Sequence, residues 1–456
     1  MYRLKQITLL LGDMLMLYLG LYLAITIRHL GWADFTFIQF TPIMSPLFAL
    51  AGLIIFVTGL YDLEKNKNNR ANFGKIAISM SVWLVFGLIY FYLDSSRTVS
   101  PKTILILNGI FGLCLISIWR FFYNKFISQS IWKINVVFAG LDKEIEELLK
   151  TLHSQPQLGY NIAGIVDENY AKTTERFAGY KIYDDIQSAL NCQKIELIVL
   201  SPSLEQDKEF VKKIISHIYR QIQIMPLANF YELTTGRIPI FALTDSWLIS
   251  NLHEQNKKIY DRVKLILDLL CAGVMAVFFL TTLPFVALLI KINSRGPIFF
   301  KQTRVGLAGR EFHVIKYRTM YSLNSDGSAE TSGPQFSSDQ DQRITMIGKF
   351  LRQTRLDEIP QFINIFKREM SIVGPRPERP EFVKQMSGCT PYYHLRHLIK
   401  PGLTGWAQIK HGYAGNLEEN LRKLEYDLHY IKNRGPMLDF IIILRTINTI
   451  TRLSGK

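Results

Sequence analysis

Long apolar runs alternate with polar stretches along this chain, and four of these runs lie close together in its first third. They are centred on residues 7–27, 43–60, 73–93 and 103–119. Each run is long enough to cross the roughly 30 Å hydrocarbon core of a bilayer as a helix. We therefore predict an N-terminal transmembrane four-helix bundle over residues 1–125.

Basic residues gather at alternate connections of this predicted bundle. Arg3 and Lys5 precede the first run, and the regions after the second and fourth runs hold Lys65, Lys67, Arg70, Lys75, Arg120, Lys125 and Lys133. The other two connections carry only Arg28, Arg97 and Lys102. Because lysine and arginine are enriched in cytoplasmic loops, both ends of the bundle are expected in the cytoplasm.

Asp13 lies early in the first apolar run. An ionisable residue inside a membrane can mark a functional site. It can also pair with a basic neighbour close to the interface, and the position of Asp13 favours this pairing.

Residues 133–250 have a different pattern, in which short buried strands alternate with helices. Strand-like runs occupy 134–140, 162–167 and 195–200, and a helical pattern covers 142–152. Strands that alternate with helices predict a parallel sheet, and hence a Rossmann-like cytosolic domain.

The dinucleotide fingerprint of such domains is incomplete here. Gly140 is followed by Leu-Asp-Lys-Glu and not by further glycines at Gly-x-Gly-x-x-Gly spacing. A structural, oligomerisation or regulatory role is therefore favoured, with dinucleotide binding as the alternative.

A fifth apolar run, residues 265–290, is long enough to span a bilayer but has basic residues at both ends. Equal basic flanks favour a segment that enters and leaves on one face. Pro284 lacks a backbone N–H and clashes with the preceding turn. Thr281 and Thr282 can donate to the carbonyls that this break frees. We predict a re-entrant membrane helix broken at Pro284, with a kinked spanning helix as the alternative.

The rest of the chain has a more soluble pattern, and we predict a mainly α catalytic domain over 258–456 that includes the re-entrant helix. Short strands come first and helices later, at 298–302, 312–316, 344–354, 358–368 and 417–431. The Ser-, Asp- and Gly-rich stretch 322–342 predicts a mobile loop near the site. The apolar end, 438–450, either lies against the membrane or pairs with another copy of the chain.

The most informative chemistry is an adjacent acidic pair, Asp357 and Glu358, among arginines. Adjacent carboxylates repel each other, so cations usually compensate them. A carboxylate nucleophile beside a carboxylate metal ligand suits phosphoryl chemistry on an anionic substrate. Taken alone, Asp357 is also a suitable N-cap for a helix with Pro360 in its first turn. The two interpretations are compatible, because a helix N-terminus also favours bound anions.

Three blocks of the sequence resemble the catalytic core of the bacterial polyprenyl-phosphate sugar-1-phosphate transferases. They are Lys316-Tyr317-Arg318-Thr319-Met320, the run from Arg355 to Pro377, and the run from Pro401 to Ile409, in the order and spacing of that family. The upstream layout resembles the long, multi-domain members. The family also has a helix–break–helix element at the place of the fifth run, often with serine before the proline, where this chain has Leu283.

The resemblance implies a two-step reaction that starts from a nucleoside-diphosphate sugar, expected to be a UDP-sugar. Asp357 attacks the sugar-bearing phosphorus, and UMP leaves. A polyprenyl phosphate, expected to be undecaprenyl phosphate, then takes the sugar phosphate from the aspartate. Glu358 is expected to hold Mg²⁺, which neutralises phosphate charge. The division of roles between the two acids comes from the resemblance, since the sequence alone does not order them.

The candidate substrate-binding residues are mostly cations, which clamp phosphate oxygens: Lys316, Arg318, Arg352, Arg355, Gln361 and Arg376. Arg352 and Arg355 are three apart and share a face if the helix persists, although both are also plausible solvated surface charges. Arg376 stands between two prolines that restrict its backbone. The block Pro401–Ile409 is interpreted either as a core-forming turn beside the membrane, with Trp406 at the lipid interface, or as a direct substrate contact.

Composition agrees with a membrane enzyme that acts on anions. The chain has 456 residues, 48% of them hydrophobic, and a formal charge of +15. A basic balance fits nucleic acid, an anionic membrane surface or an anionic substrate. The apolar runs favour the last two, and the chain lacks a nucleic-acid-binding motif. Its four cysteines are far apart, which disfavours a disulfide framework or a metal-binding pair.

We therefore expect a multi-pass protein of the bacterial inner membrane, with its catalytic domain facing the cytoplasm, that initiates exopolysaccharide, capsule or O-antigen synthesis. Two alternatives remain open at this point. One is a catalytically inactive membrane scaffold, against which the intact acidic pair argues. The other is an NAD-dependent enzyme that modifies a nucleotide sugar in the 133–250 domain, against which the incomplete fingerprint argues.

Overall fold

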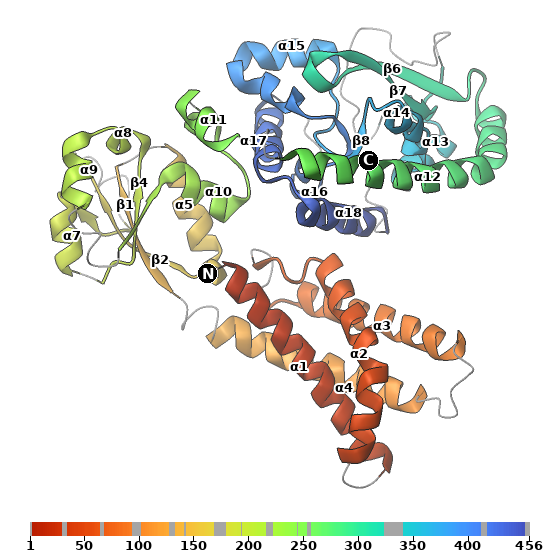
Figure 1. Cartoon of the computed structure of the whole chain (residues 1–456), viewed down its shortest axis with the longest axis horizontal. Helices are drawn as coiled ribbons and strands as arrows, with labels where there is room; N and C mark the ends of the chain where they lie inside the picture. The colour runs from red at the N-terminus through yellow and green to blue at the C-terminus, as the bar shows by residue number, and fades with distance from the viewer. Residues whose placement is uncertain are drawn as a thin grey trace. The chain divides into compact units, whose positions relative to one another are not determined.

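The computed structural model forms two compact units, Met1–Phe230 and Tyr231–Lys456. It describes residues 2–29, 34–63, 68–93, 102–126, 133–140, 143–167, 179–192, 194–215, 222–243, 245–252, 257–322, 341–411 and 417–451. The fold is mostly helical, with one parallel sheet in the first unit (Figure 1).

Four long helices open the first unit, in agreement with the apolar runs: α1 (Tyr2–His29), α2 (Asp34–Val57), α3 (Arg70–Leu93) and α4 (Lys102–Phe122). All four are apolar and long enough to cross a membrane. Their inward side chains, Phe48 and Trp83 among them, form one hydrophobic core, while others such as Leu11 and Ile78 remain exposed. Because water does not tolerate so much exposed apolar surface, these helices mark a membrane protein.

Helix α2 begins earlier than its apolar pattern predicts, and it continues through Pro42 and Pro46. Each proline removes one backbone donor. Hydroxyl groups next to them bond to carbonyls of the preceding turn: Thr41 donates to Phe37 at 2.7 Å and Ser45 to Thr41 at 2.6 Å. Internal hydrogen bonding of this kind lets a membrane helix tolerate proline.

Asp13 is paired, as its position near the interface predicted. Its carboxylate accepts from Arg120 of α4 at 2.5 and 3.1 Å and from the Tyr61 hydroxyl at 2.8 Å. Asp13 is 0% exposed and Arg120 is 2% exposed. The pair therefore fixes α1 against α4 inside the apolar core.

A five-stranded parallel sheet with the order β3-β2-β1-β4-β5 follows the helices, which confirms the Rossmann-like prediction. Its strands are β1 (Ile134–Ala139), β2 (Tyr160–Val166), β3 (Ile182–Tyr183), β4 (Leu197–Leu200) and β5 (Gln223–Pro226). The short strands β3 and β5 gave no strand signal in the sequence.

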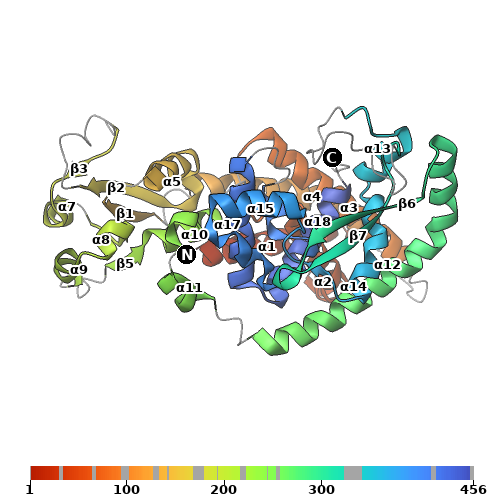
Figure 2. The ribbon, with the colours of Figure 1, turned by 90° about the horizontal axis from the view of Figure 1, so that it is seen from above.

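Helices cover both faces of this sheet. Figures 1 and 2 show α7 (Ile186–Cys192) and α9 (Lys208–Ile215) on one side, with α5 (Lys143–Ser154) and α10 (Leu227–Thr235) on the other. A short helix, α8 (Pro202–Glu205), precedes α9. This two-sided cover explains why β1 and β4 read as continuous apolar runs.

Gly140 has a packing role at the edge of the sheet where such folds bind ligands. Its φ of +85° favours glycine, and an added Cβ would lie 2.1 Å from the Ser201 hydroxyl. The carboxyl ends of β1 and β4 therefore lie close together at Gly140 and Ser201.

The fifth apolar run lies within α12 (Lys258–Asn293), which opens the larger part of the second unit. The helix is continuous from Lys258 to Asn293 and passes through Pro284, but its ribbon bends in both views (Figures 1 and 2). Thr281 and Thr282 donate to the carbonyl of Phe278 at 2.9 and 2.8 Å. They do not donate to Leu280, the carbonyl that Pro284 leaves without its helical donor.

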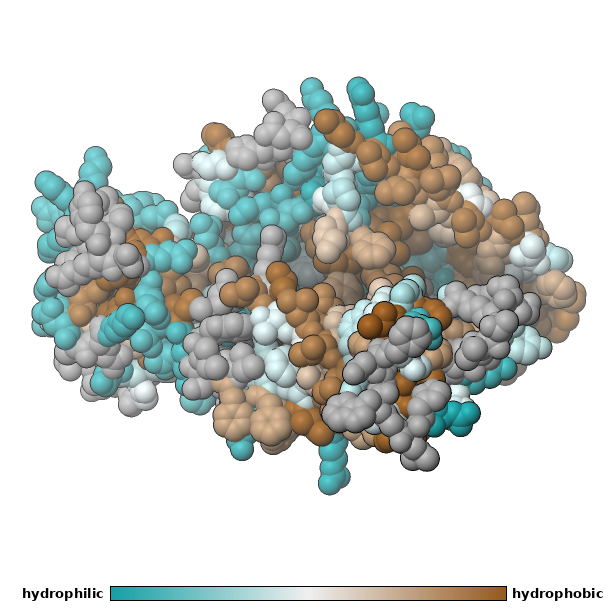
Figure 3. Space-filling model, turned by 60° about the horizontal axis from the view of Figure 1, so that its bottom comes forward, coloured by the Kyte–Doolittle hydropathy of each residue, from teal (hydrophilic) through white to brown (hydrophobic). Residues whose placement is uncertain are grey.

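One long face of α12 is apolar and exposed, as Figure 3 shows in brown. Its exposed side chains include Ile259, Ile266, Leu270, Val274, Val277, Leu280, Phe285, Leu288 and Ile292. The opposite side is fixed to the domain, where Asp268 accepts from the backbone of Ile372 at 3.0 Å and Lys264 pairs with Asp439 at 2.7 Å. The helix therefore presents its apolar face away from the domain.

The strand and helix predictions for the soluble part hold at most positions. The hairpin forms from β6 (Phe299–Val305) and β7 (Glu311–Tyr317). Further elements are α13 (Met346–Gln353), α15 (Pro380–Cys389), α16 (Trp406–Lys410), α17 (Leu417–Asn433) and α18 (Pro436–Thr451), with β8 (Ser371–Val373) parallel to β9 (Gly402–Thr404). The predicted helix over 358–368 is instead a 3₁₀ helix, η8 (Leu356–Gln361), followed by the short α14 (Phe362–Phe366). Most of the predicted mobile loop, 323–340, lies outside the described residues.

The second unit also includes residues that precede α12. Ile238 and Leu243 pack with Leu424 and Leu428 of α17, and short elements η5 (Ile240–Ala242) and α11 (Asp245–Asn251) follow α10 there. Trp406 is buried in the same region, where its indole N–H donates to Gly236 at 2.8 Å. The block Pro401–Ile409 therefore contributes to the domain core, as one of the two interpretations expected, with the Trp406 ring packed among buried side chains.

Candidate active site

The acidic pair stands on a tight turn between α13 and α14. Arg355 has φ +57°, in the left-handed region. This conformation turns the backbone after α13, and η8 begins at the next residue. Asp357 and Glu358 fall within the first turn of η8, and both are buried. The N-cap interpretation of Asp357 is wrong, since Arg355 occupies that position and η8 has no side-chain cap.

Glu358 is held by three cations from separate places in the chain. Its Oε1 accepts from Lys316 of β7 and from Arg376, each at 2.7 Å, and Oε2 lies 3.6 Å from Arg355. Burial would raise the pKa of Glu358, but the charges of Arg376, Lys316 and Arg355 hold it well below its usual range. Glu358 is therefore ionised and fixed in position.

Asp357 has a different environment. Among the residues that the structure describes, none donates a hydrogen bond to its carboxylate. Burial, reinforced by the charge of Glu358, raises the pKa of Asp357 to about 6, against Lys316, Arg352 and Arg376. A carboxylate with a raised pKa and an uncommitted lone pair is the better nucleophile of the two.

Two more predicted site residues lie close to the pair. Arg352, at the end of α13, donates to the Thr319 hydroxyl at 2.9 Å and acts electrostatically on Asp357. Because α13 ends at Gln353, Arg352 and Arg355 do not share a helical face as predicted. Gln361 is 3% exposed, and its side-chain N–H₂ lacks a partner among the described residues. It is thus a buried donor whose hydrogen-bonding capacity is not met by the described residues.

Arg318 is placed apart from the acidic pair. Its two terminal nitrogens donate to the backbone carbonyls of Ser294 and Arg295, just beyond the end of α12. Gly296 is required beside it, because an added Cβ there would meet the Arg318 guanidinium at 2.0 Å. Arg318 therefore holds the end of α12, and we do not count it among the phosphate ligands.

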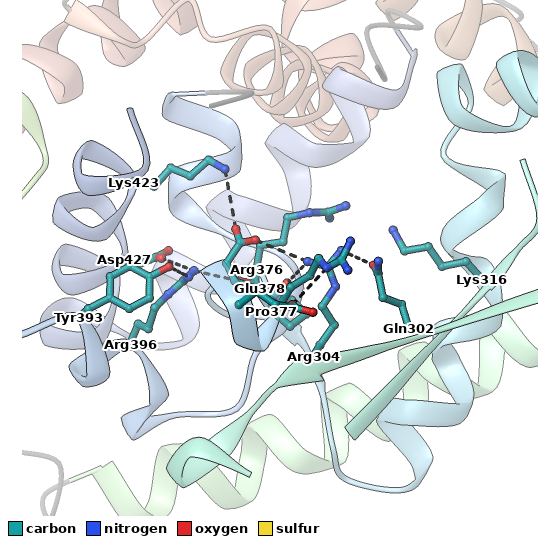
Figure 4. Close-up of polar contacts among 12 residues, drawn as sticks. Gln302, Arg304, Lys316, Arg376, Pro377, Glu378, Tyr393, Arg396, Lys423 and Asp427 are labelled. Carbon is teal, nitrogen blue, oxygen red and sulfur yellow. Dashed lines mark hydrogen bonds and ion pairs between the residues drawn. The ribbon is translucent and has the colours of Figure 1, made fainter. Parts of the chain in front are cut away.

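The sequence motifs do not include Gln302, Arg304 or Arg396, which lie near the pair. Arg304 of β6 donates to Gln302 at 2.6 Å and to the Pro377 carbonyl at 3.1 Å. Figure 4 shows Gln302, Arg304 and Lys316 close to Arg376. Gln302 and Arg304 alternate on one face of a strand, and this polar spacing was the one available signal.

The donor set allows a Mg²⁺ ion at Glu358 when phosphate oxygens take part. Within the described ranges, clusters of three or more metal-binding side chains are absent. Mg²⁺ is usually bound through one or two carboxylates together with substrate phosphates and water. The nearest donor to Glu358 Oε2 among the residues that the structure covers is Arg355 at 3.6 Å, so this oxygen fits the requirement.

Among the described residues, one buried carboxylate thus has no hydrogen-bond donor while its neighbour is held by three cations. Such an arrangement suits phosphoryl transfer from an anionic donor. Two parts of the chain match known families: residues 259–453 match the bacterial sugar transferase family, and residues 57–215 match a CoA-binding domain.

Relatives with assigned names match shares of this chain between 38% and 96%. A UDP-N-acetylgalactosamine-undecaprenyl-phosphate N-acetylgalactosaminephosphotransferase from Aeromonas hydrophila is 40% identical over 50% of this chain and 52% of its own length. A UDP-glucose:undecaprenyl-phosphate glucose-1-phosphate transferase from Klebsiella pneumoniae is 28% identical over 96% of this chain and 93% of its own. An exopolysaccharide production protein from Rhizobium leguminosarum is 38% identical over 38% of this chain and 86% of its own.

The chain belongs to the polyprenyl-phosphate sugar-1-phosphate transferase family. This confirms the resemblance of the three sequence blocks and the enzyme class that it implied. The match to the Aeromonas transferase spans about half the length of that protein, and the match to the Klebsiella transferase spans nearly all of it. The sheet of the first unit lies mostly inside the region that matches the CoA-binding domain.

Proposed function

We propose that this protein transfers a sugar 1-phosphate from a UDP-sugar to undecaprenyl phosphate, through a covalent phosphosugar–Asp357 intermediate, and so initiates a surface glycan. The names of the Aeromonas and Klebsiella relatives combine a UDP-linked sugar with undecaprenyl phosphate. The sugar differs between those two names, so the shared part of the donor is the UDP group.

The contrast between the two acids carries this proposal. Glu358 is committed to Lys316 and Arg376 at 2.7 Å each, whereas Asp357 lacks a hydrogen-bond donor among the described residues. Attack requires a carboxylate oxygen with a free lone pair. This assigns Asp357 as the nucleophile and Glu358 as the group that fixes cations around the phosphates.

The reaction is balanced by two displacements at one phosphorus. In the first, an Asp357 oxygen bonds to the sugar-bearing phosphorus. At the same time the bond between that phosphorus and the oxygen that leaves with UMP breaks. In the second, an undecaprenyl phosphate oxygen bonds to that phosphorus and the bond to Asp357 breaks. The carboxylate is thereby regenerated, and both displacements leave the oxidation states unchanged. Arg376, Lys316 and the Gln361 amide are placed to neutralise and orient phosphate oxygens.

Glu358 would hold a Mg²⁺ ion together with oxygens of the donor, which supplies charge neutralisation when bound. The contacts of Lys316 and Arg376 with Glu358 Oε1 leave Oε2 for this purpose. Removal of divalent cations with a chelator should therefore stop turnover, and Glu358→Gln should lose the dependence on added Mg²⁺ together with most of its rate.

We further propose that α12 is re-entrant and that the second unit faces the cytoplasm of the inner membrane. The exposed apolar face and the bend of α12 support this placement (Figure 2), as do the basic residues at both of its ends. The phosphate of the lipid acceptor remains at the interface, on the side to which nucleotide sugars have access.

Mass spectrometry of the full-length protein in detergent tests the covalent step. Incubation with a panel of UDP-sugars should release UMP and add a sugar phosphate to the peptide that carries Asp357. Asp357→Asn should abolish both, while Glu358→Asp, which keeps a carboxylate, should retain some adduct. Steady UMP release without any added mass on this peptide would refute the intermediate. Absence of UMP release from every donor would instead favour a scaffold.

A further inference from the structure

Arg376 stands on a segment whose backbone carbonyls are all held by donors from elsewhere in the domain. The carbonyl of Pro375 accepts from the backbone of Gly402 at 2.8 Å, and that of Glu378 accepts from Val305 at 2.9 Å. Between them, Arg304 donates to Pro377 at 3.1 Å. Each contact comes from a strand that is itself paired in a sheet.

The carbonyl of Arg376 itself accepts from Arg396, at 2.9 Å. Arg396 comes from η9 (Pro391–Leu398), and its guanidinium also donates to Asp427 of α17 at 2.8 Å and to the Tyr393 hydroxyl at 2.6 Å. Figure 4 shows Arg396 between these two partners and the Arg376–Glu378 segment. The buried guanidinium of Arg396 thus connects α17 to Arg376, the residue that donates to Glu358.

The ion pair between Arg396 and Asp427 is not expected to add much to the free energy of unfolding. Their side chains are 5% and 3% exposed, and removal of both charges from water carries a penalty that their attraction often fails to exceed. Apolar residues of similar size would commonly hold such a position as well or better. A buried pair that directs one of its hydrogen bonds to a site backbone is more useful for geometry than for stability.

We propose that Arg396, oriented by Asp427, is a positioning residue that fixes the Arg376 guanidinium for phosphoryl transfer. This rests on the proposed function. Arg376 extends from the held backbone to Glu358 at 2.7 Å, so a shift of its carbonyl displaces the guanidinium from the reacting phosphate. Misplacement by about 1 Å can cost about a hundredfold in rate even when no reacting group is altered.

The chain provides a matched control on the same helix. Glu425 lies two residues before Asp427 and forms an ion pair with Arg237 at 2.9 Å, with side chains 14% and 7% exposed. It also accepts from the backbone of Ile240 at 3.3 Å. These contacts lead to the segment before α12 and not to Arg376. Loss of this pair therefore tests the effect of removing a buried ion pair as such.

The experiment compares full-length Arg396→Met/Asp427→Leu with the control Arg237→Met/Glu425→Leu. The measurements are thermal unfolding, UMP release with saturating UDP-sugar and undecaprenyl phosphate, the KM for the donor, and the amount of trapped Asp357 adduct, which counts active sites. We expect both double variants to remain folded. The Arg396 pair should lose at least about tenfold in turnover per active site with little change in KM, whereas the control should keep the wild-type turnover.

Equal turnover per active site in the two double variants would overturn the proposal. Both variants have lost one buried ion pair, but only the Arg396 variant has lost the contact with the Arg376 carbonyl. Asp427→Asn provides a second arm that preserves shape and the hydrogen bond but removes the charge. It should show an intermediate loss, and wild-type turnover in this variant together with an unfolded Arg396→Met/Asp427→Leu would also overturn the proposal. Wild-type protein that releases no UMP would refute the proposed function and not the positioning role.

Discussion

Asp357 and Glu358 are adjacent in the chain, but their surroundings change their pKa values in opposite directions. Burial acts on both, yet the three cations that contact Glu358 outweigh it there. Asp357 receives the charge of Glu358 in addition to burial, which raises its pKa to about 6. The residue that we propose as the nucleophile is therefore the one whose protonation falls within an accessible pH range.

The rate of UMP release should accordingly fall as the pH decreases through about 6. The sign follows from the raised pKa of Asp357, because a protonated carboxyl group does not attack. Glu358 stays ionised over the same range. Initial rates at saturating donor between pH 5 and pH 8 would measure the acid limb of the pH–rate profile. An acid limb near pH 4, the usual range of an aspartate, would contradict the raised pKa of Asp357.

Asp427 requires a separate check, since burial also raises its pKa to about 6. Arg352 acts on Asp357 and lowers its pKa. Arg352→Gln should therefore move the acid limb to higher pH if Asp357 causes it, and should leave the limb unchanged if Asp427 does.

The turn before the acidic pair gives a prediction about stability. Arg355 has φ +57°, a conformation that costs an L-residue about 1–2 kcal/mol and glycine almost nothing. Both Arg355→Gly and Arg355→Ala remove the contact with Glu358, but only the alanine keeps the backbone penalty. Arg355→Gly should be the more stable of the two by about 1 kcal/mol in chemical unfolding. The reverse order would show that this turn differs in solution.

At this scale the sequence identified the acidic pair and its cations but not their individual contacts. Lys316 and Arg376 could be predicted because they lie in motifs beside the pair. Arg318 belongs to the same motif as Lys316, yet its guanidinium caps the end of α12. The direction of a side chain depends on packing between distant segments, which a motif does not encode. Arg396 was missed for the same reason, since its partner Asp427 is 31 residues away.

Helix α12 is continuous through Pro284 and yet visibly bent, so the helix alone does not distinguish a re-entrant path from a crossing. Single cysteines at Lys258 and Arg295, in a background without the native cysteines, would decide. We expect both to react with a membrane-impermeant maleimide from the cytoplasmic side, because basic residues flank both ends. Labelling from opposite sides would show that α12 crosses the membrane.

Helices α1 and α4 depend on one buried ion pair for their register. Arg120→Leu should destabilise the membrane helices by about 3–5 kcal/mol, because it leaves the Asp13 charge buried without its cation. Asp13→Leu/Arg120→Leu should recover most of this loss. Lys125→Leu, at an exposed position of the same segment, is the control and should change stability by less than about 0.5 kcal/mol. Unfolding in mixed detergent would measure all three, and an undisturbed Arg120→Leu would contradict the assigned role.

Elements with a strong internal pattern were predictable, and those defined by their neighbours were not. The four N-terminal helices, the long strands and the β6–β7 hairpin follow from periodicity. Strand β3 has only two residues, and it pairs with β2 because the sheet edge is available. The turn at η8 replaces a predicted α-helix, since the left-handed Arg355 and Pro360 together favour a tighter 3₁₀ turn.

For the molecule as a whole, the compact catalytic unit and the family match begin at different places. The match starts at residue 259, whereas the second unit starts at Tyr231. The Rhizobium relative, 86% of which aligns to 38% of this chain, shows that a part shorter than half of this chain can make up most of a relative. In this chain, however, Ile238 and Leu243 cover apolar side chains of α17, and the Trp406 indole donates to Gly236.

The segment from α10 to α11 should therefore be necessary for a stable catalytic unit. Fragment 227–456, which keeps the whole of α10, should fold in detergent and form the Asp357 adduct. Fragment 258–456 should aggregate or lose the adduct, because it exposes Leu424 and Leu428 and leaves Glu425 without Arg237. Adduct stoichiometry and size-exclusion profiles of the two fragments would measure the difference. Equal behaviour would mean that the segment only connects the sheet domain to an independent transferase, as the shorter match implies.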